Sequence, residues 1–299
     1  LLISNEGHAM SSPNPHDLIL DGTKIQFYPE RIAAWERGER IAPITIDCAL
    51  LPRPRCAYSC GYCYANLQEQ AGWEKKTITK QVITDFLDDA AEIGVRGISF
   101  VSDGESSHHR DFVYAVQYCK ARGLDMAVGS NSLVIREKMS REIIPHLTYL
   151  RVNISAGEPE RYAEIMGVKA GYFEQVVQNV RDMVRVKRET GSACTIGLQM
   201  VLQPQYRDQI MPLTRLALDL EVDYFVAKHC SDSEFGEIGV DYEGYGPLYP
   251  LLREAEAMAN EKTAIHIKWS KLGDKGKRNY SRCYGPPFII QISGTGLIA

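Results

Sequence analysis

The sequence lacks the features that would place the chain in a membrane or along a nucleic acid. No apolar run reaches the roughly 18 residues that a bilayer-spanning helix needs. Basic residues are not in excess, since 34 Lys and Arg stand against 38 Asp and Glu, the net charge is −4 and no long basic stripe is present. A phosphate backbone is therefore not the favoured partner on electrostatic grounds.

The chain also lacks low-complexity linkers and internal repeats, and its 299 residues are 44% hydrophobic. That is enough for one large domain with a sizeable core, or for a domain with a small appendage. The opening tract LLISNEGHAM reads poorly as a natural start, so we expect a vector remnant and a native start near Met10. We assign residues 1–43 to this remnant and an N-terminal lead-in.

Eight cysteines do not form a disulfide framework here, because such frameworks are typical of short, loop-rich secreted chains. Three of them are clustered: Cys56, Cys60 and Cys63. The others are scattered: Cys48, Cys119, Cys194, Cys230 and Cys283. We predict that the first three scattered cysteines are small buried hydrophobic residues. Because the clustered thiols must stay reduced to bind a metal, they indicate a reducing cytoplasm.

Strand-like and helix-like segments alternate through most of the sequence. The expected strands are 42–51, 95–102, 124–130, 148–155, 193–202 and 222–230, and the expected helices are 77–94, 110–123, 136–147, 172–191, 207–221 and 248–260. Six such units predict an α/β fold with a parallel sheet, which we expect to be a partial (β/α)6 TIM-like barrel over residues 44–262. Two later strands, 264–269 and 287–293, are expected to start a separate C-terminal β extension over residues 263–299.

Polar segments follow the expected strands at the point where each strand ends. In chain order they are the cysteine loop, SDGESSHHR, GSNS, NISAGEPE, QPQ and KHCSDSE. Functional residues of parallel α/β folds gather at the carboxyl ends of the strands. The pattern therefore predicts an active-site face at this end of the barrel.

The cysteine loop CAYSCGYC allows two interpretations. A structural zinc site needs four ligands, so a fourth would have to come from a distant residue such as Cys48, His108 or His109. In the other interpretation, three thiolates hold three irons of a [4Fe–4S] cluster and the fourth iron stays open for a non-protein ligand. CxxxCxxC spacing with an aromatic residue between the last two cysteines favours the cluster.

This loop, with Tyr62 as the aromatic residue and its place after the first strand of a βα barrel, resembles the radical SAM superfamily. In that family S-adenosylmethionine (SAM) chelates the open iron, and the reduced cluster cleaves it to a 5′-deoxyadenosyl radical that abstracts hydrogen from the substrate. The resemblance, which covers residues 44–231, implies an oxidoreductase or isomerase with a [4Fe–4S] cluster and SAM. It also implies a flavodoxin- or ferredoxin-type electron donor.

The resemblance assigns further cofactor-binding positions. SDGES stands where the family's GGE-type motif binds the methionine amino group, which implies Asp103, Gly104 and Glu105, with Asp103 in place of the first glycine. GSNS and NIS resemble the positions that contact the ribose and carboxylate, which implies Asn131, Asn153 and Ser155, and Tyr62 is placed beside the adenine.

The partner of the SAM carboxylate departs from the family pattern. Some relatives place an arginine shortly after the fourth strand, and the alignment of YAEIMG puts Met166 there instead. The contact is therefore expected from Lys169 or Lys228.

The C-terminal segment CYGPPFIIQISGTGLIA resembles the opening of a SPASM or twitch extension, whose pattern is C-x9–15-G-x4-C, with Cys283 at the first cysteine and Gly296 at the glycine. Counting from Gly296 places the next cysteine beyond Ala299. We therefore expect a natural C-terminal part that carries ligands for one or two auxiliary [4Fe–4S] clusters, with Cys283 as the first. The alternative is a finished hairpin with one spare thiol.

Residues near the last strand end are candidates for substrate chemistry. Cys230 could donate a hydrogen atom to a substrate radical, and the alternative is a partly buried free thiol. His108 and His109 are candidates for a base or a phosphate contact, or for a solvated loop pair. The same alternatives hold for His229 and Asp232.

The leading functional hypothesis is a radical SAM enzyme that abstracts hydrogen from a small polar substrate such as a sugar or nucleotide sugar. The lead-in KIQFYPERIAAWERGERIAPITIDCALLPRPRC supports it, because it resembles radical SAM proteins with SPASM-type tails, several of which are associated with polysaccharide clusters. The alternative is modification of a ribosomally made peptide by epimerisation, crosslinking or oxidation. A non-catalytic iron–sulfur protein or zinc-binding module is a third class.

Overall fold

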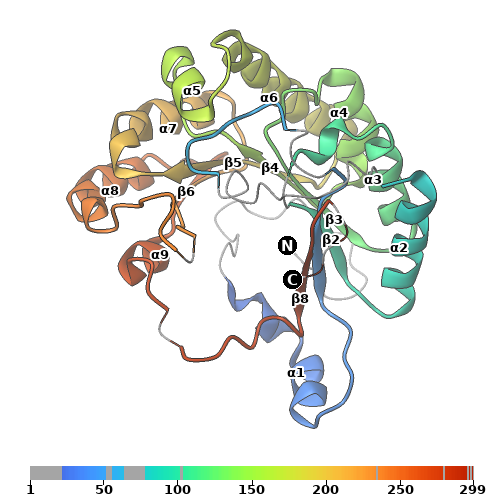
Figure 1. Cartoon of the computed structure of the whole chain (residues 1–299). Coiled ribbons are helices and arrows are strands. Elements are labelled where there is room, and N and C mark those ends of the chain that lie inside the picture. Colours follow the sequence, from blue (N-terminus) through green and yellow to red (C-terminus); the bar gives the residue numbers. More distant parts are fainter. Residues whose placement is uncertain are drawn as a thin grey trace.

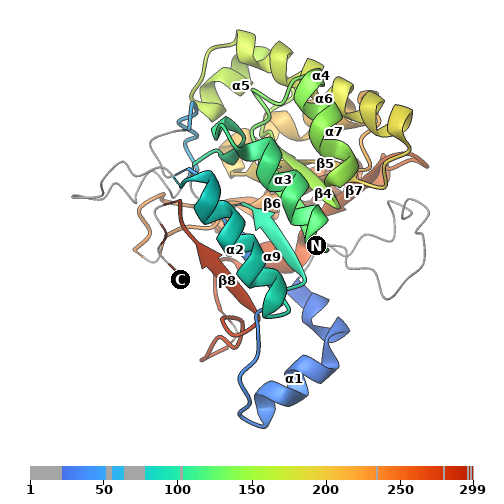
Figure 2. The same ribbon diagram turned by 90° about the vertical axis from the view of Figure 1, so that its right-hand side faces the viewer.

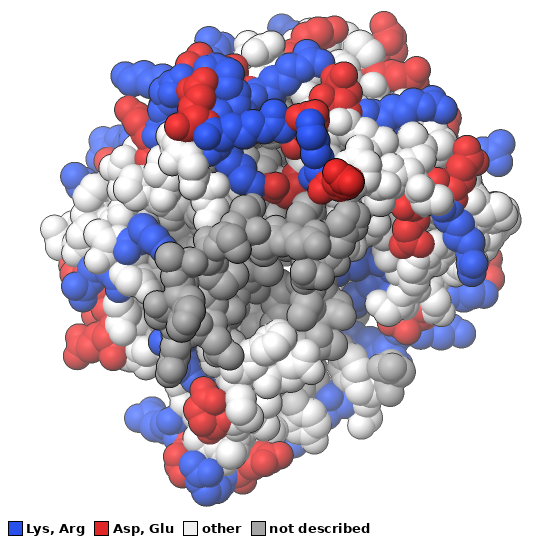
Figure 3. Space-filling view, turned by 180° about the vertical axis from the view of Figure 1, so that it is seen from behind, with Lys and Arg blue, Asp and Glu red and all other residues white. Residues whose placement is uncertain are grey.

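The computed structural model describes residues 22–51, 56–63, 78–101, 104–233, 235–278, 280–294, 296 and 298. Helices cover the outside of a curved parallel sheet (Figure 1). Within the described residues, no helix is long and apolar enough to cross a membrane. Acidic and basic side chains are interspersed over the face in Figure 3, which agrees with the absence of a basic stripe from the sequence.

The sheet contains eight parallel strands in the order β7-β6-β5-β4-β3-β2-β1-β8. Their bounds are β1 Thr45–Cys48, β2 Gly97–Phe100, β3 Asp125–Ser130, β4 Tyr149–Asn153, β5 Thr195–Leu202, β6 Tyr224–His229, β7 Ala264–Ile267 and β8 Ile289–Ile292. The six expected strands and the open, partial barrel are thereby confirmed.

The two C-terminal strands do not form a separate element. β7 extends the sheet beside β6, and β8 pairs in parallel with β1 from Thr45↔Ile289 to Cys48↔Ile292. The expectation that these strands start something separate is wrong for the described residues. The assignment of residues 263–299 to a SPASM-type extension stays a prediction.

The helices are α1 Pro29–Glu36, α2 Lys80–Glu92, α3 Phe112–Ala121, α4 Glu137–Ile143, α5 Pro159–Met166, α6 Gly171–Thr190, α7 Ile210–Asp219, α8 Tyr249–Ala257 and α9 Trp269–Asp274. Thr79 caps α2, because its side chain accepts a hydrogen bond from the Val82 N–H. Figure 2 shows α2 and α3 packed side by side on the outside of the sheet. The short helix α5 is absent from the sequence-based expectations.

The two faces of each strand have different surroundings. In β4, Leu150 and Val152 are fully buried in the main core with the helices, and the alternate residues Tyr149, Arg151 and Asn153 point to the barrel interior. In β6, Tyr224 packs on Tyr149 across the interior, their rings stacked at 5.7 Å. The interior therefore has an aromatic floor near the amino ends of the strands, with polar side chains above it.

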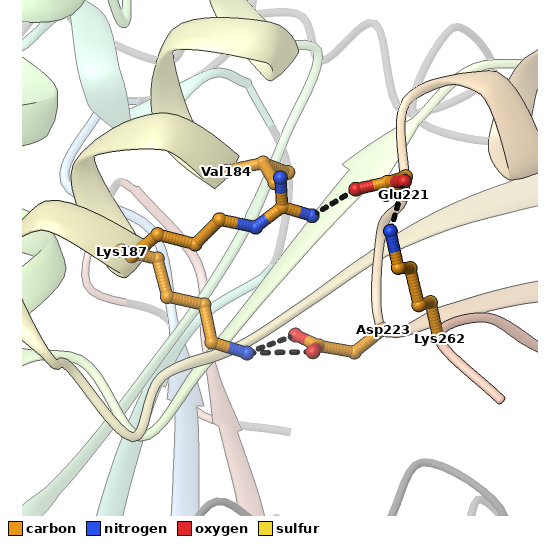
Figure 4. A pocket seen from close by; sticks show the side chains of 6 residues that line it. Val184, Lys187, Glu221, Asp223 and Lys262 are labelled. Atoms are coloured by element: carbon orange, nitrogen blue, oxygen red, sulfur yellow. Dashed lines mark hydrogen bonds and ion pairs between the residues drawn. The ribbon is translucent and has the colours of Figure 1, made fainter.

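A cluster of charged side chains lies at the amino-terminal end of the barrel, opposite the carboxyl ends of the strands (Figure 4). Lys187 on α6 contacts both oxygens of Asp223 at 2.6 Å, and Asp223 also accepts a hydrogen bond from the Ile196 N–H. Glu221 pairs with both Arg188 and Lys262. Because every charge in this pocket has an opposite partner, the cluster is suited to holding α6 against β5 and β6.

Candidate active site

The cysteine loop is held in place by the helix that the sequence did not predict. The Ser59 and Gly61 N–H groups donate to the carbonyls of Met166 and Ile165, each at 3.2 Å. These carbonyls belong to the last turn of α5, where backbone oxygens have no partner within the helix. The end of α5 is therefore the support on which the cysteine loop rests.

Tyr58 fixes the same loop from inside. Its side chain is buried, its hydroxyl shares a 2.8 Å hydrogen bond with the Tyr162 hydroxyl on α5, and its ring stacks on Tyr172 at the start of α6. Gly167, the residue after α5, has φ +62, and a Cβ there would lie 2.4 Å from the Ser59 carbonyl oxygen. The loop thus approaches the helix end closely enough to require glycine.

Cys56, Cys60 and Cys63 are half-buried free thiols. Burial, together with the neighbouring Cys63 and Cys56, raises the pKa of Cys60 to about 12, so the three thiols are close enough to repel one another as thiolates. Iron would balance that negative charge. In a [4Fe–4S] cluster each thiolate binds a different iron, and this set of three thiols on the loop after β1 fits such a cluster.

A single metal ion fits less well. Within the described residues, no group of three or more His, Cys, Asp and Glu side chains is placed to hold one ion. The distant fourth ligands of the zinc hypothesis are engaged elsewhere or turned away: Cys48 is buried in the core, and His108 is exposed.

Glu105 connects the ends of β2 and β3. Its Oε1 accepts hydrogen bonds from the Ser107 N–H, the Ser107 hydroxyl and the Ser130 hydroxyl, and its Oε2 accepts from the Asn131 N–H at 2.7 Å. Gly104 precedes it with φ +74, and Asp103 lies outside the described residues. Most of the acceptor capacity of the carboxylate is thus used within the protein, where it fixes Asn131.

We predict that Glu105→Gln lowers the free energy of unfolding by about 1–3 kcal/mol, because one accepting oxygen becomes an amide that faces donors in a buried site. Urea unfolding of the metal-free protein measures the change. Glu164→Gln is the control, since Glu164 is exposed and makes a surface ion pair with Arg161, so the loss of its charge is expected to cost about 0–1 kcal/mol. Equal midpoints for the two variants would contradict the prediction.

Asn131 connects Glu105 to the cysteine loop. Its Nδ2 donates to the Cys56 Sγ at 3.8 Å, and its Oδ1 accepts from the Leu133 N–H at 3.0 Å. A hydrogen bond to sulfur stabilises the thiolate form that binds iron. The sequence placed Asn131 at the end of the third strand, and the structure shows that it lies beside Cys56.

Tyr62, Ser155 and Met166 form a second chain of contacts. The Ser155 hydroxyl donates to the Tyr62 hydroxyl at 2.9 Å, and the Tyr62 hydroxyl donates to the Met166 Sδ at 3.1 Å. The Val201 N–H in turn donates to the Ser155 hydroxyl. The aromatic residue of the motif is thus fixed between the fourth strand end and α5. Met166 is the acceptor at the end of these contacts.

Cys230 lies against the same loop, with 1% of its surface exposed. Its thiol points toward the Tyr62 carbonyl at 3.9 Å and the Ser231 carbonyl at 3.6 Å. Burial raises the pKa of Cys230, so the thiol keeps its hydrogen at neutral pH. The structure therefore brings together the cysteine loop and the thiol that the sequence singled out after the sixth strand.

The histidines near the strand ends have structural contacts. His109 accepts from the Asp111 N–H through Nδ1 at 3.0 Å, so its Nε2 carries the hydrogen and donates to the Ile78 carbonyl at 2.8 Å. His229 donates through Nδ1 to the Cys230 carbonyl, and its ring packs on Tyr242. Both ring nitrogens of His109 are therefore used within the protein, and a role of His229 as a base stays a prediction.

The other predicted residues lie in a loop, on the interior face of the sheet or at the surface. Asp232 accepts from the N–H groups of Ser233, Ile238 and Val240, and although burial opposes it, these bonds lower the pKa of the carboxyl and shape the loop after β6. Asn153 accepts from the Gln199 side chain at 3.0 Å on the interior face of the sheet. Lys169 and Cys283 are exposed.

Lys228 lies on the interior face of β6, two residues before Cys230. Burial, together with the charge of Arg151 on β4, lowers the pKa of Lys228 to about 8. Sequence reasoning missed Arg151, whose only signal is the alternation of TYLRVNIS. The two cations share the interior of the barrel below the strand ends.

We predict that Lys228→Met stabilises the metal-free protein at pH 7 by about 1–3 kcal/mol, because it removes a partly buried charge. In the wild type the folded state releases the Lys228 proton near pH 8, and the unfolded state holds it to its ordinary pKa of 10.5. The unfolded state binds more protons in that window, so wild-type stability rises with pH and the advantage of the variant disappears.

Urea unfolding between pH 7 and pH 10.5 measures this difference. Lys120→Met is the control, because Lys120 is exposed in the last turn of α3, and we expect its effect to stay within about 0.5 kcal/mol at every pH. A constant difference between Lys228→Met and wild type over this range would contradict the prediction.

Comparison with known proteins agrees with this geometry. Residues 50–215 match the Radical SAM superfamily. Because this match covers more than half of the chain, the chain belongs to the radical SAM superfamily, whose members are enzymes that use a [4Fe–4S] cluster and S-adenosylmethionine.

Individual relatives are distant. The chain is 21% identical over 224 residues to the tungsten-containing aldehyde ferredoxin oxidoreductase cofactor-modifying protein of Pyrococcus furiosus, across 73% of this chain and 61% of that protein. The structure of Streptococcus suis SuiB bound to S-adenosylmethionine has a TM-score of 0.66 at 16% identity, covering 94% of this chain and 66% of SuiB. Native anSMEcpe with bound AdoMet has a TM-score of 0.59 at 11% identity, covering 86% and 73%.

A second SuiB structure, bound to its precursor peptide SuiA, has a TM-score of 0.62 at 16% identity, covering 99% of this chain and 67% of SuiB. At these identities the likeness shows the fold. The chain spans about two thirds or less of the length of SuiB and of the Pyrococcus protein.

Proposed function

We propose that Cys56, Cys60 and Cys63 bind a [4Fe–4S] cluster and that the enzyme cleaves S-adenosylmethionine reductively to modify a peptide. When bound, the cluster and SAM supply a 5′-deoxyadenosyl radical that abstracts a hydrogen atom from the substrate. The observation that carries the proposal is the support of the cysteine loop from both sides, by the end of α5 and by Asn131.

The surrounding residues have positioning roles in this proposal. Asn131 orients and polarises the first thiol, and Tyr62 and Ser155 form the wall on which SAM lies. Gly104 and Asn153 complete the SAM contacts by the family resemblance. Glu105 acts through Asn131, since its oxygens are engaged with the protein.

Cys230 is proposed as a hydrogen donor to the substrate radical. Its thiol is protonated by burial and lies beside the cysteine loop, where a substrate radical would form. A Cys230→Ser variant that still forms 5′-deoxyadenosine but no longer places solvent deuterium in the product would support the role. Unchanged deuterium incorporation would exclude it.

A peptide is favoured over a sugar as the substrate. SuiB, which shares the fold, has been seen with a precursor peptide. No observation among the described residues favours a sugar, so that hypothesis has only the resemblance of the lead-in segment behind it. The exposed Cys283 is proposed as a ligand of an auxiliary cluster, which would appear as iron in excess of one cluster per chain and be lost in Cys283→Ala.

Anaerobic reconstitution with iron and sulfide, followed by dithionite and SAM, tests the proposal. 5′-Deoxyadenosine is followed by chromatography with no substrate, with short synthetic peptides and with nucleotide sugars. Formation stimulated by a peptide would support the proposal, and stimulation by nucleotide sugars alone would restore the sugar hypothesis. Tight zinc binding with no iron uptake would overturn the assignment of the cysteine loop.

A further inference from the structure

Two cations inside the barrel have no partner. Arg151 on β4 and Lys228 on β6 both lie on the interior face, and in the described part of the chain neither makes an ion pair or a hydrogen bond. The Arg151 Nε is fully buried and unpartnered. Burying a cation without a partner costs free energy, so a fold retains such a pair only when something else compensates for it.

The sheet leaves room for the arginine head group. Gly129 on β3 is the register partner of Arg151, and a Cβ at Gly129 would lie 3.1 Å from the Arg151 Nη2 and 2.8 Å from the Val101 Cγ2. The guanidinium therefore lies across the bare backbone of β3, on the interior side of the sheet. A side chain at position 129 would occupy the space that the guanidinium takes.

Two other cations among the described residues show the usual arrangement, in which a carboxylate neutralises the charge. The Lys187 side chain, 13% exposed, contacts both oxygens of Asp223. The partly buried Arg161 pairs with Asp208. The nearest acidic residue on the interior face of β1, Asp47, already has an interaction of its own. The charge of Arg151 and Lys228 is therefore left for a ligand.

The two cations lie at different depths, and the depth of Arg151 favours a substrate over the cofactor as the ligand. Arg151 comes four residues before Ser155, which is about 13 Å along the strand direction, so it lies deeper in the barrel than the Ser155 layer that contacts the cysteine loop. Lys228 shares a register layer with Val201, whose N–H donates to the Ser155 hydroxyl, whereas Arg151 shares one with Gly197 and Tyr224, so Lys228 lies four residues nearer the carboxyl ends of the strands. A molecule that reaches both cations would extend from the strand ends into the barrel.

We propose that Arg151 and Lys228 bind an oxyanion, a carboxylate or phosphate group, carried by the substrate. Arginine offers a planar fork of N–H donors and lysine a point charge, a combination suited to oxygen anions. The inference rests on the proposed function, since it assumes that the substrate enters the barrel interior. It assigns to that substrate an acidic group such as an Asp or Glu side chain, a C-terminal carboxylate or a phosphate.

Protection of Lys228 from reductive methylation tests the proposal in the full chain, both reconstituted and metal-free. Peptide mass spectrometry follows Lys228 and the exposed Lys120 in sodium phosphate, sodium acetate and sodium chloride of equal ionic strength. We expect phosphate or acetate to slow the labelling of Lys228 about tenfold relative to chloride and to leave Lys120 unchanged. The more effective anion distinguishes phosphate from carboxylate chemistry.

Two outcomes would overturn the proposal. One is equal labelling of Lys228 in all three salts, and the other is full protection by SAM alone in the reconstituted protein, which would give the cations to the cofactor. Calorimetric titration with the more protective anion should show binding to wild type and Lys120→Met, and binding weaker by about tenfold in Arg151→Met and Lys228→Met. Binding that is unchanged in both of these variants would also refute it.

None of these measurements depends on deoxyadenosine formation. A chain that binds no cluster but protects Lys228 would refute the proposed function and retain the anion site. A chain that cleaves SAM but shows no protection of Lys228 would support the proposed function and refute the anion site. Arg151→Lys, which keeps the charge and the fold but loses the fork, serves if Arg151→Met does not fold.

Discussion

Cys60→Ala is expected to abolish both stable iron binding after reconstitution and 5′-deoxyadenosine formation. Cys60 is the middle cysteine of the loop and interacts electrostatically with both other thiols. Two remaining thiolates would leave two irons of a [4Fe–4S] cluster without protein ligands, and such a cluster is lost on desalting. Iron and sulfide analysis, the visible absorption of the cluster and chromatography of the SAM reaction measure the effect.

The matched control is Cys194→Ala. Cys194 is a fully buried core cysteine, as predicted, and lies before β5 at the opposite end of the barrel from the site. Its loss should cost about 1–2 kcal/mol of unfolding free energy and leave iron content and deoxyadenosine at wild-type levels. Iron retained by Cys60→Ala, or lost equally in both variants, would show that the loop is not the cluster site.

Gly167→Ala is expected to remove most of the iron-binding capacity without touching any ligand. Alanine at φ +62 is strained by about 1–2 kcal/mol, and its Cβ would lie 2.4 Å from the carbonyl oxygen of Ser59. Backbone cannot yield as a flexible side chain can, so the cysteine loop must move away from the end of α5. We expect a loss of about 2–4 kcal/mol in unfolding free energy, together with the loss of stable cluster.

Gly191→Ala separates these two effects. Gly191 ends α6 with nearly the same backbone conformation, φ +63, and nothing lies within 4 Å of the position of its Cβ. The variant should therefore show the conformational strain alone, about 1–2 kcal/mol, with full iron binding. If Gly191→Ala loses as much iron as Gly167→Ala, general destabilisation rather than loop displacement is the cause.

The strands were predictable because each is a short apolar run followed by polar residues, and the helices because their apolar residues recur at helical spacing. α5 was missed although Tyr162, Ile165 and Met166 follow Pro159 at helical spacing and Gly167 ends the helix. Its eight residues directly follow a strand end that had been interpreted as a polar loop. The places of β7 and β8 depend on pairing between distant segments, which local pattern does not contain.

For the site, the cysteine spacing predicted the chemistry, and the strand ends correctly collected Asn131, Ser155 and Cys230 near it. The support by α5 and the four hydrogen bonds of Glu105 could not be predicted, because they require three-dimensional positions. Arg151 was invisible for another reason. Alternation in β4 shows that the strand has two faces, but it does not show that the second face encloses the interior of a barrel rather than solvent.

The pairing of β8 with β1 joins segments from near the two ends of the described chain. Because this pairing closes a loop that contains nearly the whole fold, its loop-closure entropy is large and we expect it to form late in folding. Until then the outer edge of β1, the strand that leads into the cysteine loop, presents unpaired N–H and C=O groups. A strand of another chain could pair with these groups. During synthesis on the ribosome, this edge stays open until the last strand has emerged, and self-association of incomplete chains is expected to begin there.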